Sequence, residues 1–460
     1  MSSTPTDNGF KSQRSQFTTR LGVIAATVGS SVGLGNIWRF PYEAGSHGGA
    51  AFILCYVIFI ALIGIPVICA EFVLGRQSRS DLYGCFKRLG ARRGWNYLGY
   101  IGIIASMLII SFYSVVAGWT LEYLWQTVSG TLLSHGNDGD AYQTAFREFS
   151  EASWRPLFWT LLFLAINHLV VRGGVQKGIE RVSNILMPLL FAILVVLCIN
   201  SLFMPGAAEG LRFIFHPDFS ALTPRVIVTA LGQAFFSLSI GLGCMLTYAS
   251  YFNNSVPLLR NATITAGLDT LVAIMAGVLI FPAVFTYGVQ PSEGPALVFA
   301  VLPSIFASMP GGTFVCELFF LMLVVASLTS TISMSEISIA FFVDQRKMRR
   351  RKACGISTAV ALVGGTLCTL SMSGVSDIHI GSYTLDFFDA FNNLSSNVCL
   401  PIGGLFISIF AGWKLAPHIM RHQLTNGGHL KHIPVKVLVF LLRYVCPVAI
   451  AVILLTPLFI

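Results

Sequence analysis

Short oxygen-bearing side chains gather around a five-residue phrase that occurs twice in the chain. Residues 31–35 read Ser-Val-Gly-Leu-Gly, and residues 239–243 read Ser-Ile-Gly-Leu-Gly. Hydroxyl, amide and carboxylate oxygens are hard ligands that suit Na⁺ better than a transition metal. The residues of this kind near the two phrases are Ser30, Ser31, Asn36, Ser237, Ser239, Asp269, Thr329, Ser330 and Thr331. They predict a site for a small cation beside a polar ligand.

The composition places most of the chain in a membrane. Of the 460 residues, 55% are hydrophobic and 11% are charged, and the mean hydropathy is +0.74. Too few charges are present to cover a soluble surface. Apolar runs long enough to cross the hydrocarbon core lie roughly at 21–45, 51–75, 97–127, 157–172, 182–203, 225–252, 263–289, 313–343, 355–373, 387–413 and 436–459. The sequence therefore predicts an all-α integral membrane protein with about eleven transmembrane helices.

The repeated phrase lies inside the first and the sixth of these segments. Two glycines around a leucine weaken a helix, because glycine loses the most backbone entropy and has no side chain to pack. An interrupted helix is tolerated in lipid only where its freed N–H and C=O groups face a cavity or a ligand. Paired interruptions in two halves of a chain are typical of a transporter binding site. The exposed helix ends suit the carboxylate and the ammonium of a zwitterion.

Ordinary helix packing is the alternative interpretation of the small residues. Gly29 and Gly33 have the small-xxx-small spacing of a packing face, and serine hydroxyls in helices usually bond to nearby backbone. Asp269 is different, because an unpaired carboxylate inside a membrane costs several kcal/mol. We therefore interpret Asp269 as functional. The ten cysteines show neither metal-ligand nor disulfide spacing, and we expect them to be packing residues.

Positive charge follows every second segment. Six Lys and Arg residues lie between Arg76 and Arg93, whereas none lies between residues 290 and 312. Because such residues accumulate on the cytoplasmic side, we expect a cytoplasmic N-terminus and an external C-terminus in an inner (plasma) membrane. This rule accounts for the net charge of +9, which therefore does not indicate nucleic acid. We expect the basic stretch 414–436 to be a solvated loop, with contact to anionic membrane lipid as the alternative.

Several motifs carry a resemblance to a known family. They are GSSVGLGNIWRFP at 29–41, GGAAF at 48–52, EFVLGR at 71–76, KGIER at 177–181 and GQAFFSLS at 232–239. The chain resembles the neurotransmitter:sodium symporter family, and within it the bacterial LeuT-like amino-acid transporters. The resemblance implies a 5+5 inverted repeat with broken first and sixth helices. Its parts would be a cytoplasmic tail (1–20), a first repeat (21–205), a second repeat (206–415), and a basic cytoplasmic loop with helix 11 (416–460).

The resemblance also implies two sodium sites and no organic cofactor. One sodium would be held by carbonyls and hydroxyls of Gly29, Val32, Ala326, Thr329 and Ser330. The other would be held by Ser31, Asn36, Ser237 and Asp269 together with the substrate carboxylate. A ligand shared between ion and substrate would make their binding cooperative.

The substrate site follows from the same resemblance. Its expected residues are Ser30, Ser31, Gly33, Gly35, Ile109, Tyr113, Phe236, Ser239, Leu242, Ser330 and Met334. The Gly33 and Gly35 amides and the Tyr113 hydroxyl would bind the substrate carboxylate. Since none of these residues is charged, we predict a neutral, apolar amino acid, aliphatic or aromatic. Gly33 stands where amine-transporting relatives carry an aspartate, which argues against amines.

Two gates can be placed in the same way. Outside, Arg39 would pair with Asp389, directly or through water, with Asp386 as the less favoured partner, above a lid of Tyr113 and Phe236. Inside, Arg14 would pair with Asp344, while Phe17 and Tyr251 brace the closure. Simple anchoring of the tail by its positive charge is the alternative role for Arg14.

The sequence thus predicts a sodium-coupled symporter that imports its substrate by alternating access. We hypothesise that Asp269 supplies the negative charge that chloride supplies in some relatives, so that transport is independent of chloride. The alternative function is a nontransporting amino-acid sensor on the same scaffold. No nucleophile-base pair or phosphate loop indicates an enzyme, and no segment implies an obligatory protein partner.

Overall fold

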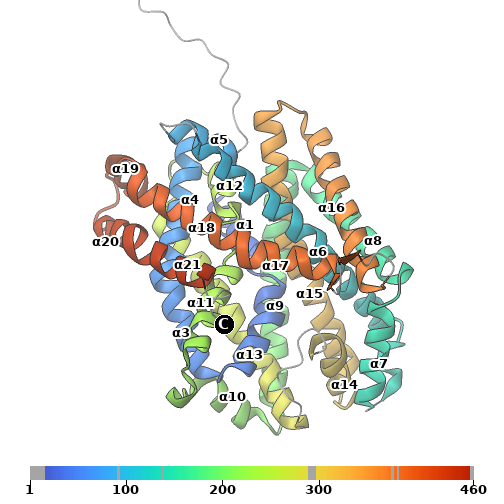
Figure 1. Ribbon diagram of the computed structural model, residues 1–460. Helices are drawn as coiled ribbons and strands as arrows, with labels where there is room; N and C mark the ends of the chain where they lie inside the picture. The colour runs from blue at the N-terminus through green and yellow to red at the C-terminus, as the bar shows by residue number, and fades with distance from the viewer. Residues whose placement is uncertain are drawn as a thin grey trace, which may run out of the picture.

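The computed structural model describes residues 16–90, 94–136, 138–288, 297–374, 378–380 and 383–455. Almost all of this chain is helical. Besides helices, the described residues form one two-stranded sheet. In it β1 (Ile378–Ile380) runs antiparallel to β2 (Tyr383–Leu385), and Ile378 lies opposite Leu385. The prediction of an all-α membrane fold is confirmed (Figure 1).

Nine uninterrupted helical segments of the described chain are long and apolar enough to cross a membrane. Their α-helices are α3 (Ala50–Phe59) with α4 (Ile65–Ser78), α6 (Leu98–Val128), α8 (Trp154–Arg172), α9 (Arg181–Leu202), α13 (Leu258–Tyr287), α15 (Gly312–Gln345), α16 (Arg350–Met372), α17 (Phe387–Asn393) with α18 (Leu400–Ile409), and α20 (Val435–Phe440) with α21 (Cys446–Leu455). π-Helical turns join or extend several of them: η2 (Ile60–Gly64), η5 (Val175–Glu180), η8 (Leu394–Cys399), η9 (Phe410–Lys414) and η10 (Leu441–Val445).

The first and sixth predicted segments are the interrupted ones. The first consists of α1 (Arg20–Ser31), the π-helical η1 (Gly35–Arg39) and α2 (Phe40–Ser46), and its two parts meet at an angle of 53°. The sixth consists of α11 (Pro224–Ser237) and α12 (Cys244–Ala249). Hydroxyl side chains fix both starts, because Thr19 caps α1 and Thr223 caps α11.

Shorter elements connect the membrane-crossing helices. They are α5 (Leu82–Leu89), η3 (Trp95–Tyr97), η4 (Leu132–His135), α7 (Gly139–Ser150), α10 (Ala207–Phe215), η6 (Phe219–Ala221), η7 (Leu297–Val301), α14 (Leu302–Ala307) and α19 (Pro417–Leu424). Figure 1 shows α7, α10 and α14 at one end of the bundle, and α5 and α19 toward the other. The connecting helices are therefore divided between two ends, as two opposite membrane faces require.

Helices that are distant in sequence lie side by side in the bundle. α1 packs against α9, α13 and α15, while α3 packs against α11 and α4 against α12. The first half of the chain is therefore interleaved with the second, and the interrupted α1 lies among helices from both halves.

Positive backbone angles mark the interruption of the sixth segment. Between α11 and α12, Gly241 and Gly243 have φ of +86° and +85°. Glycine adopts such angles without a steric penalty, because it has no Cβ. Ser239 has φ of +52°, and its hydroxyl donates to the Ser30 carbonyl at 3.4 Å. The two interruptions therefore meet, as the repeated phrase predicted.

A buried carboxylate holds the interrupted segment in place. Glu71 on α4 is fully buried, and its two oxygens accept hydrogen bonds from the Gly241 N–H at 3.0 Å and the Leu246 N–H at 3.1 Å. These donors lie at the break of the helix, where intrahelical partners are missing. Because no water is present in the membrane core, a side chain must satisfy them. Glu71 therefore satisfies the backbone donors that the interruption leaves free within the membrane.

Close helix packing gives a first test of the fold. A Cβ placed on Gly118 of α6 would lie 2.7 Å from the Thr160 backbone nitrogen of α8. We expect Gly118→Ala to force the two helices apart and to lower stability by about 1–3 kcal/mol. The measurement is the half-life of folded protein in detergent at a fixed elevated temperature. Gly232→Ala is the matched control, because nothing lies within 4 Å of a Cβ built there. Equal half-lives for the two variants would contradict the packing described.

The role of Glu71 gives a second test. Glu71→Gln keeps one acceptor oxygen but turns the NH₂ group of its amide, itself a donor, toward the other backbone N–H. Loss of a hydrogen bond to a charged group weakens the structure by about 1.5–3 kcal/mol, so we expect roughly 10- to 100-fold faster hydrogen exchange across residues 238–249. Hydrogen exchange with mass spectrometry measures it. The control is Glu122→Gln, which removes another buried carboxylate, on α6. Unchanged exchange at 238–249 in Glu71→Gln would contradict the assignment.

Candidate functional site

Four polar side chains form a buried cluster beside the two interruptions. The Asn36 amide nitrogen donates to Ser237 Oγ and to Asp269 Oδ1, both at 2.9 Å. Ser237 Oγ donates to Asp269 Oδ2 at 2.6 Å, and the Tyr56 hydroxyl donates to Ser237 Oγ at 3.0 Å. Asn36, Tyr56 and Asp269 are fully buried. The structure thus brings Asn36, Ser237 and Asp269 together, as the sequence predicted.

The same cluster has the chemistry of a sodium site. The carboxylate of Asp269 and the hydroxyls of Ser237 and Tyr56 converge there beside the Asn36 amide, and no sulfur or imidazole of the described residues takes part. The nearby Gln233 donates to the Gly35 carbonyl at 3.1 Å, whereas its own side-chain oxygen is buried without a hydrogen-bond partner among the described residues. A buried unpaired oxygen is costly unless a cation or donor reaches it. The residues therefore fit a hard cation.

A second group of oxygens lies where α1 meets α15. The Ser330 hydroxyl donates to the Val32 carbonyl at 3.0 Å, and the Thr329 hydroxyl donates to the Ala326 carbonyl at 3.0 Å. A Cβ built on Gly29 would lie 3.3 Å from Thr329 Cβ, so this glycine is what allows the two backbones to approach. All five residues predicted for this group lie together. They provide carbonyl and hydroxyl oxygens only, which also suit Na⁺.

A small cavity lies between the two oxygen groups. It is lined by Ser31, Gly33, Gly35, Ile109, Tyr113, Phe236, Ser237, Ser239, Leu242, Ser330, Met334 and Leu400. These include every residue predicted for the substrate site except Ser30. The carbonyl of Ser30 accepts a hydrogen bond from the hydroxyl of Ser239, which does line the cavity. The cavity volume is about 20 Å³, which is close to the space that one water needs. None of the residues that line it is charged.

Two glycines leave room for this cavity. A Cβ on Gly33 would lie 2.5 Å from Ser330 Oγ and 2.8 Å from the Tyr113 hydroxyl oxygen. A Cβ on Gly35 would lie 2.9 Å from the Phe236 ring. The Tyr113 hydroxyl accepts a hydrogen bond from the Leu34 N–H at 2.9 Å. The backbone of the first interruption is therefore in direct reach of whatever the cavity holds.

A wider cavity of about 310 Å³ lies on the other side of Tyr113 and Phe236, which line both spaces. Arg39 lies at this wider cavity, with its guanidinium 4.4 Å from the centre of the Phe236 ring. The predicted lid of two aromatic rings therefore lies between an inner and an outer space. Asn392, Asn393, Ser396 and Asn397 make the far wall polar.

Arg39 has a different partner from the predicted one. Its Nε lies 3.5 Å from an oxygen of Glu43, one turn further along the same segment, and an i,i+4 spacing places such side chains side by side. Asp386 instead caps α17, where it accepts from the Phe388 N–H at 2.8 Å. Asp389 is exposed. The sequence analysis did not consider Glu43, although its spacing from Arg39 was a usable signal.

The predicted inner gate is described in part. Arg14 lies outside the described residues. Phe17 is buried and packs edge-on against the Tyr248 ring, with 5.9 Å between centroids, and its N–H donates to the Tyr251 carbonyl at 3.2 Å. Asp344 accepts from the Asp81 N–H at 2.8 Å. Phe17 and Tyr251, which we expected to brace the inner closure, are therefore in contact.

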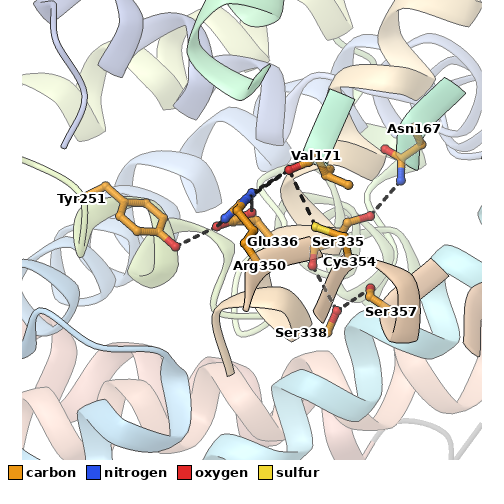
Figure 2. Close-up of polar contacts among 9 residues, drawn as sticks. All are labelled: Asn167, Val171, Tyr251, Ser335, Glu336, Ser338, Arg350, Cys354 and Ser357. Carbon is orange, nitrogen blue, oxygen red and sulfur yellow. Dashed lines mark hydrogen bonds and ion pairs between the residues drawn. The ribbon is translucent and has the colours of Figure 1, made fainter. Parts of the chain in front are cut away.

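A buried ion pair that the sequence analysis missed continues this region (Figure 2). Glu336 on α15 is fully buried and pairs with Arg350 of α16 at 2.6 Å. The Tyr251 hydroxyl donates to Glu336 at 2.7 Å, and Arg350 also donates to the Val171 carbonyl of α8 at 2.9 Å. Three helices and the turn after α12 therefore meet around this ion pair. The signal available in the sequence was an acidic residue within an apolar helix.

Comparisons with known proteins agree with this geometry. The profile of the sodium:neurotransmitter symporter family matches residues 14–145 and 142–459. The sodium-dependent transporter YhdH of Bacillus subtilis is 39% identical over 96% of this chain and 97% of its own length. A sodium-dependent transporter of Haemophilus influenzae is 34% identical over 97% of this chain and 99% of its own.

A solved structure is similar over almost the whole molecule. The crystal structure of MhsT in complex with L-phenylalanine is 42% identical, covers 96% of this chain and 99% of its own, and superposes with a TM-score of 0.88. The family profile, the relatives and the solved structure each match almost the whole chain, and the interrupted helices and buried oxygen clusters agree with them. The chain therefore belongs to the sodium:neurotransmitter symporter family and is a sodium-dependent, multi-pass membrane symporter.

Proposed function

We propose that this symporter imports a neutral, apolar amino acid, aliphatic or aromatic, together with sodium. The observation that carries the proposal is the uncharged cavity between two helix interruptions, with an oxygen cluster on either side. The similarity to MhsT, a protein solved with L-phenylalanine, supports it. A charged side chain would find no counter-charge among the residues that line the cavity.

The backbone of the first interruption would orient the substrate. Its carboxylate would accept from N–H groups at Gly33 and Gly35 and from the Tyr113 hydroxyl, which lies 2.9 Å from the Leu34 nitrogen. Its ammonium would donate to carbonyls near Ser30, at the end of α1, and near Ser239 in the opposing break. This polarity follows the partial charges at helix ends. The apolar side chain would contact residues of α6, α11 and α15: Ile109, Phe236 and Met334, with Leu242 beside them.

Two sodium ions would bind next to the substrate. One would be held by Asn36, Ser237, Asp269 and the Ser31 carbonyl, and the other by the group at Gly29, Val32, Ala326, Thr329 and Ser330. The ions supply the driving force. A tenfold sodium gradient contributes about 1.4 kcal/mol per ion, and a potential of about 100 mV adds about 2.3 kcal/mol, so that two ions would supply roughly 7 kcal/mol.

Alternating access would use the two ends of the molecule. Outside, Arg39 would leave Glu43 for Asp389 as Tyr113 and Phe236 close over the substrate. Inside, release would need movement of α1, which Phe17 anchors against Tyr248 and Tyr251. The distribution of Lys and Arg residues supports a cytoplasmic N-terminus and an external C-terminus in an inner membrane. Residues 21–205 and 206–415 would be the two repeats.

Uptake by proteoliposomes tests the proposal. Under an inward sodium gradient we expect labelled phenylalanine, leucine or tryptophan to accumulate, and to remain outside when potassium replaces sodium. Lysine and glutamate should not be transported. Gly33→Ala should lose uptake, because its methyl would meet Ser330 and Tyr113, whereas Gly232→Ala should retain it. Sodium-dependent binding without accumulation would favour a sensor, and binding of no amino acid would overturn the substrate assignment.

The proposed role of Asp269 gives a separate test. If its carboxylate supplies the negative charge beside sodium, wild-type uptake should not change when gluconate replaces chloride. Asp269→Asn should weaken sodium binding about 10- to 100-fold, because a charged ligand becomes neutral. Asp218→Asn, which removes an exposed carboxylate, is the control. The measurement is the sodium dependence of uptake, and loss of wild-type uptake without chloride would contradict the hypothesis.

A further inference from the structure

A broad basic groove lies between the connecting helix α19, the segment that follows it, and the start of the last membrane-crossing segment, α20 with η10. Its volume is about 1010 Å³, and its cationic side chains are Arg421, Lys431, Lys436 and Arg443. Figure 1 shows α19 and α20 next to each other at the edge of the bundle, away from the central helices. The basic groove is therefore separate from the substrate cavity and open to the surroundings of the protein.

The charge of this groove is entirely of one sign. None of the residues that line it is acidic, and residues 390–460 include neither Asp nor Glu. Arg421, Lys431 and Lys436 are exposed. Like charges held close together repel one another and destabilise the fold. An anion bound in the groove would therefore stabilise it.

Arg443 is the most unusual of the four cations. It lies in η10, eight residues beyond the start of α20, which corresponds to about 12 Å along a helix. Its Nε donates to the Gly412 carbonyl at 2.9 Å, and its guanidinium lies 4.9 Å from the centre of the Trp413 ring. No ion pair with a carboxylate is formed by Arg443 within the described chain. Arg443 thus has a carbonyl and an aromatic ring as neighbours but no anion, whereas an ionisable side chain on a membrane-crossing segment is almost always paired.

An exposed apolar strip continues from the groove along the same helix. Val437, Phe440, Tyr444 and Val448 are between 47% and 66% exposed, and their spacing places them on one face. Trp413, which is 54% exposed, lies beside Arg443, in the manner of an interfacial aromatic residue. Cationic groove and apolar strip together match a ligand with an anionic head and a hydrocarbon tail.

We propose that the basic groove binds one anionic phospholipid. The phosphate of the headgroup would lie among Arg421, Lys436 and Arg443, and its acyl chains would follow the strip from Val437 to Val448. Basic pockets between membrane helices hold such headgroups, and each nearby cation strengthens the attraction. A free phosphate would use the cations but leave the apolar strip uncovered, so the lipid is the occupant that satisfies both halves of the site.

Native mass spectrometry of the full chain tests this inference. The protein in detergent is titrated with palmitoyl-oleoyl phosphatidylglycerol or with the matching phosphatidylcholine. We expect one phosphatidylglycerol to remain bound at concentrations where phosphatidylcholine does not. The variant Arg421→Gln/Lys431→Gln/Lys436→Gln, which changes exposed side chains only, should bind it about 100-fold more weakly. Arg443→Gln should weaken binding as well.

The matched control is Arg346→Gln/Lys347→Gln/Arg349→Gln, which removes three exposed cations from the segment between α15 and α16. This control should stay within about twofold of the wild type, because a factor of two is only about 0.4 kcal/mol. Equal weakening in the two triple variants, or none in either, would overturn the proposal. Displacement of the lipid by millimolar inorganic phosphate would likewise overturn it, because the site would then recognise phosphate alone.

Discussion

The absence of water from the membrane core governs this structure, because every backbone N–H and C=O group placed there needs a partner within the protein. An unbroken helix meets that requirement by itself. This chain interrupts two helices at the centre of the bundle, and so has to provide partners from elsewhere. Glu71 supplies them for the sixth segment, and the Asn36 side chain accepts the Gly33 N–H at 3.1 Å in the first. Side chains that resemble packing residues in the sequence are thus the support of the site.

The two oxygen clusters and the cavity share residues, so that each cluster is in direct contact with the space where a ligand would bind. Ser330 lines the cavity and also contacts the Val32 carbonyl, while Ser237 lines it and also contacts Asp269. One hydroxyl therefore separates each oxygen cluster from the cavity. Coupling between ion and ligand over such a distance needs no relay through the rest of the protein.

Much of this arrangement could be predicted from the sequence, since its signals are local. The repeated Ser-x-Gly-Leu-Gly phrase located both interruptions, and Asp269 was marked by being a carboxylate in an apolar helix. The partners of Arg39 and the roles of Glu71 and Glu336 were not predicted. Glu71 contacts Gly241, which lies more than a hundred positions away in the sequence. Glu336 pairs with Arg350 on the next helix, and Arg350 in turn contacts Val171 of α8. Periodicity and composition carry no information on which helices meet. The contact of Arg39 with Glu43 was missed for the opposite reason, since this partner is a near neighbour in the sequence.

The small volume of the central cavity has a consequence for the barrier function of the membrane. A space of about 20 Å³ admits hardly more than one water, so beneath the aromatic rings of Tyr113 and Phe236 this cavity leaves no room for a hydrated ion in this conformation. A bare ion crossing such a dry constriction would lose its hydration, which costs far more than thermal energy. The same packing that shapes the cavity thereby makes the closed protein an electrical insulator. In this conformation sodium would not leak through the protein and would cross only during coupled transport.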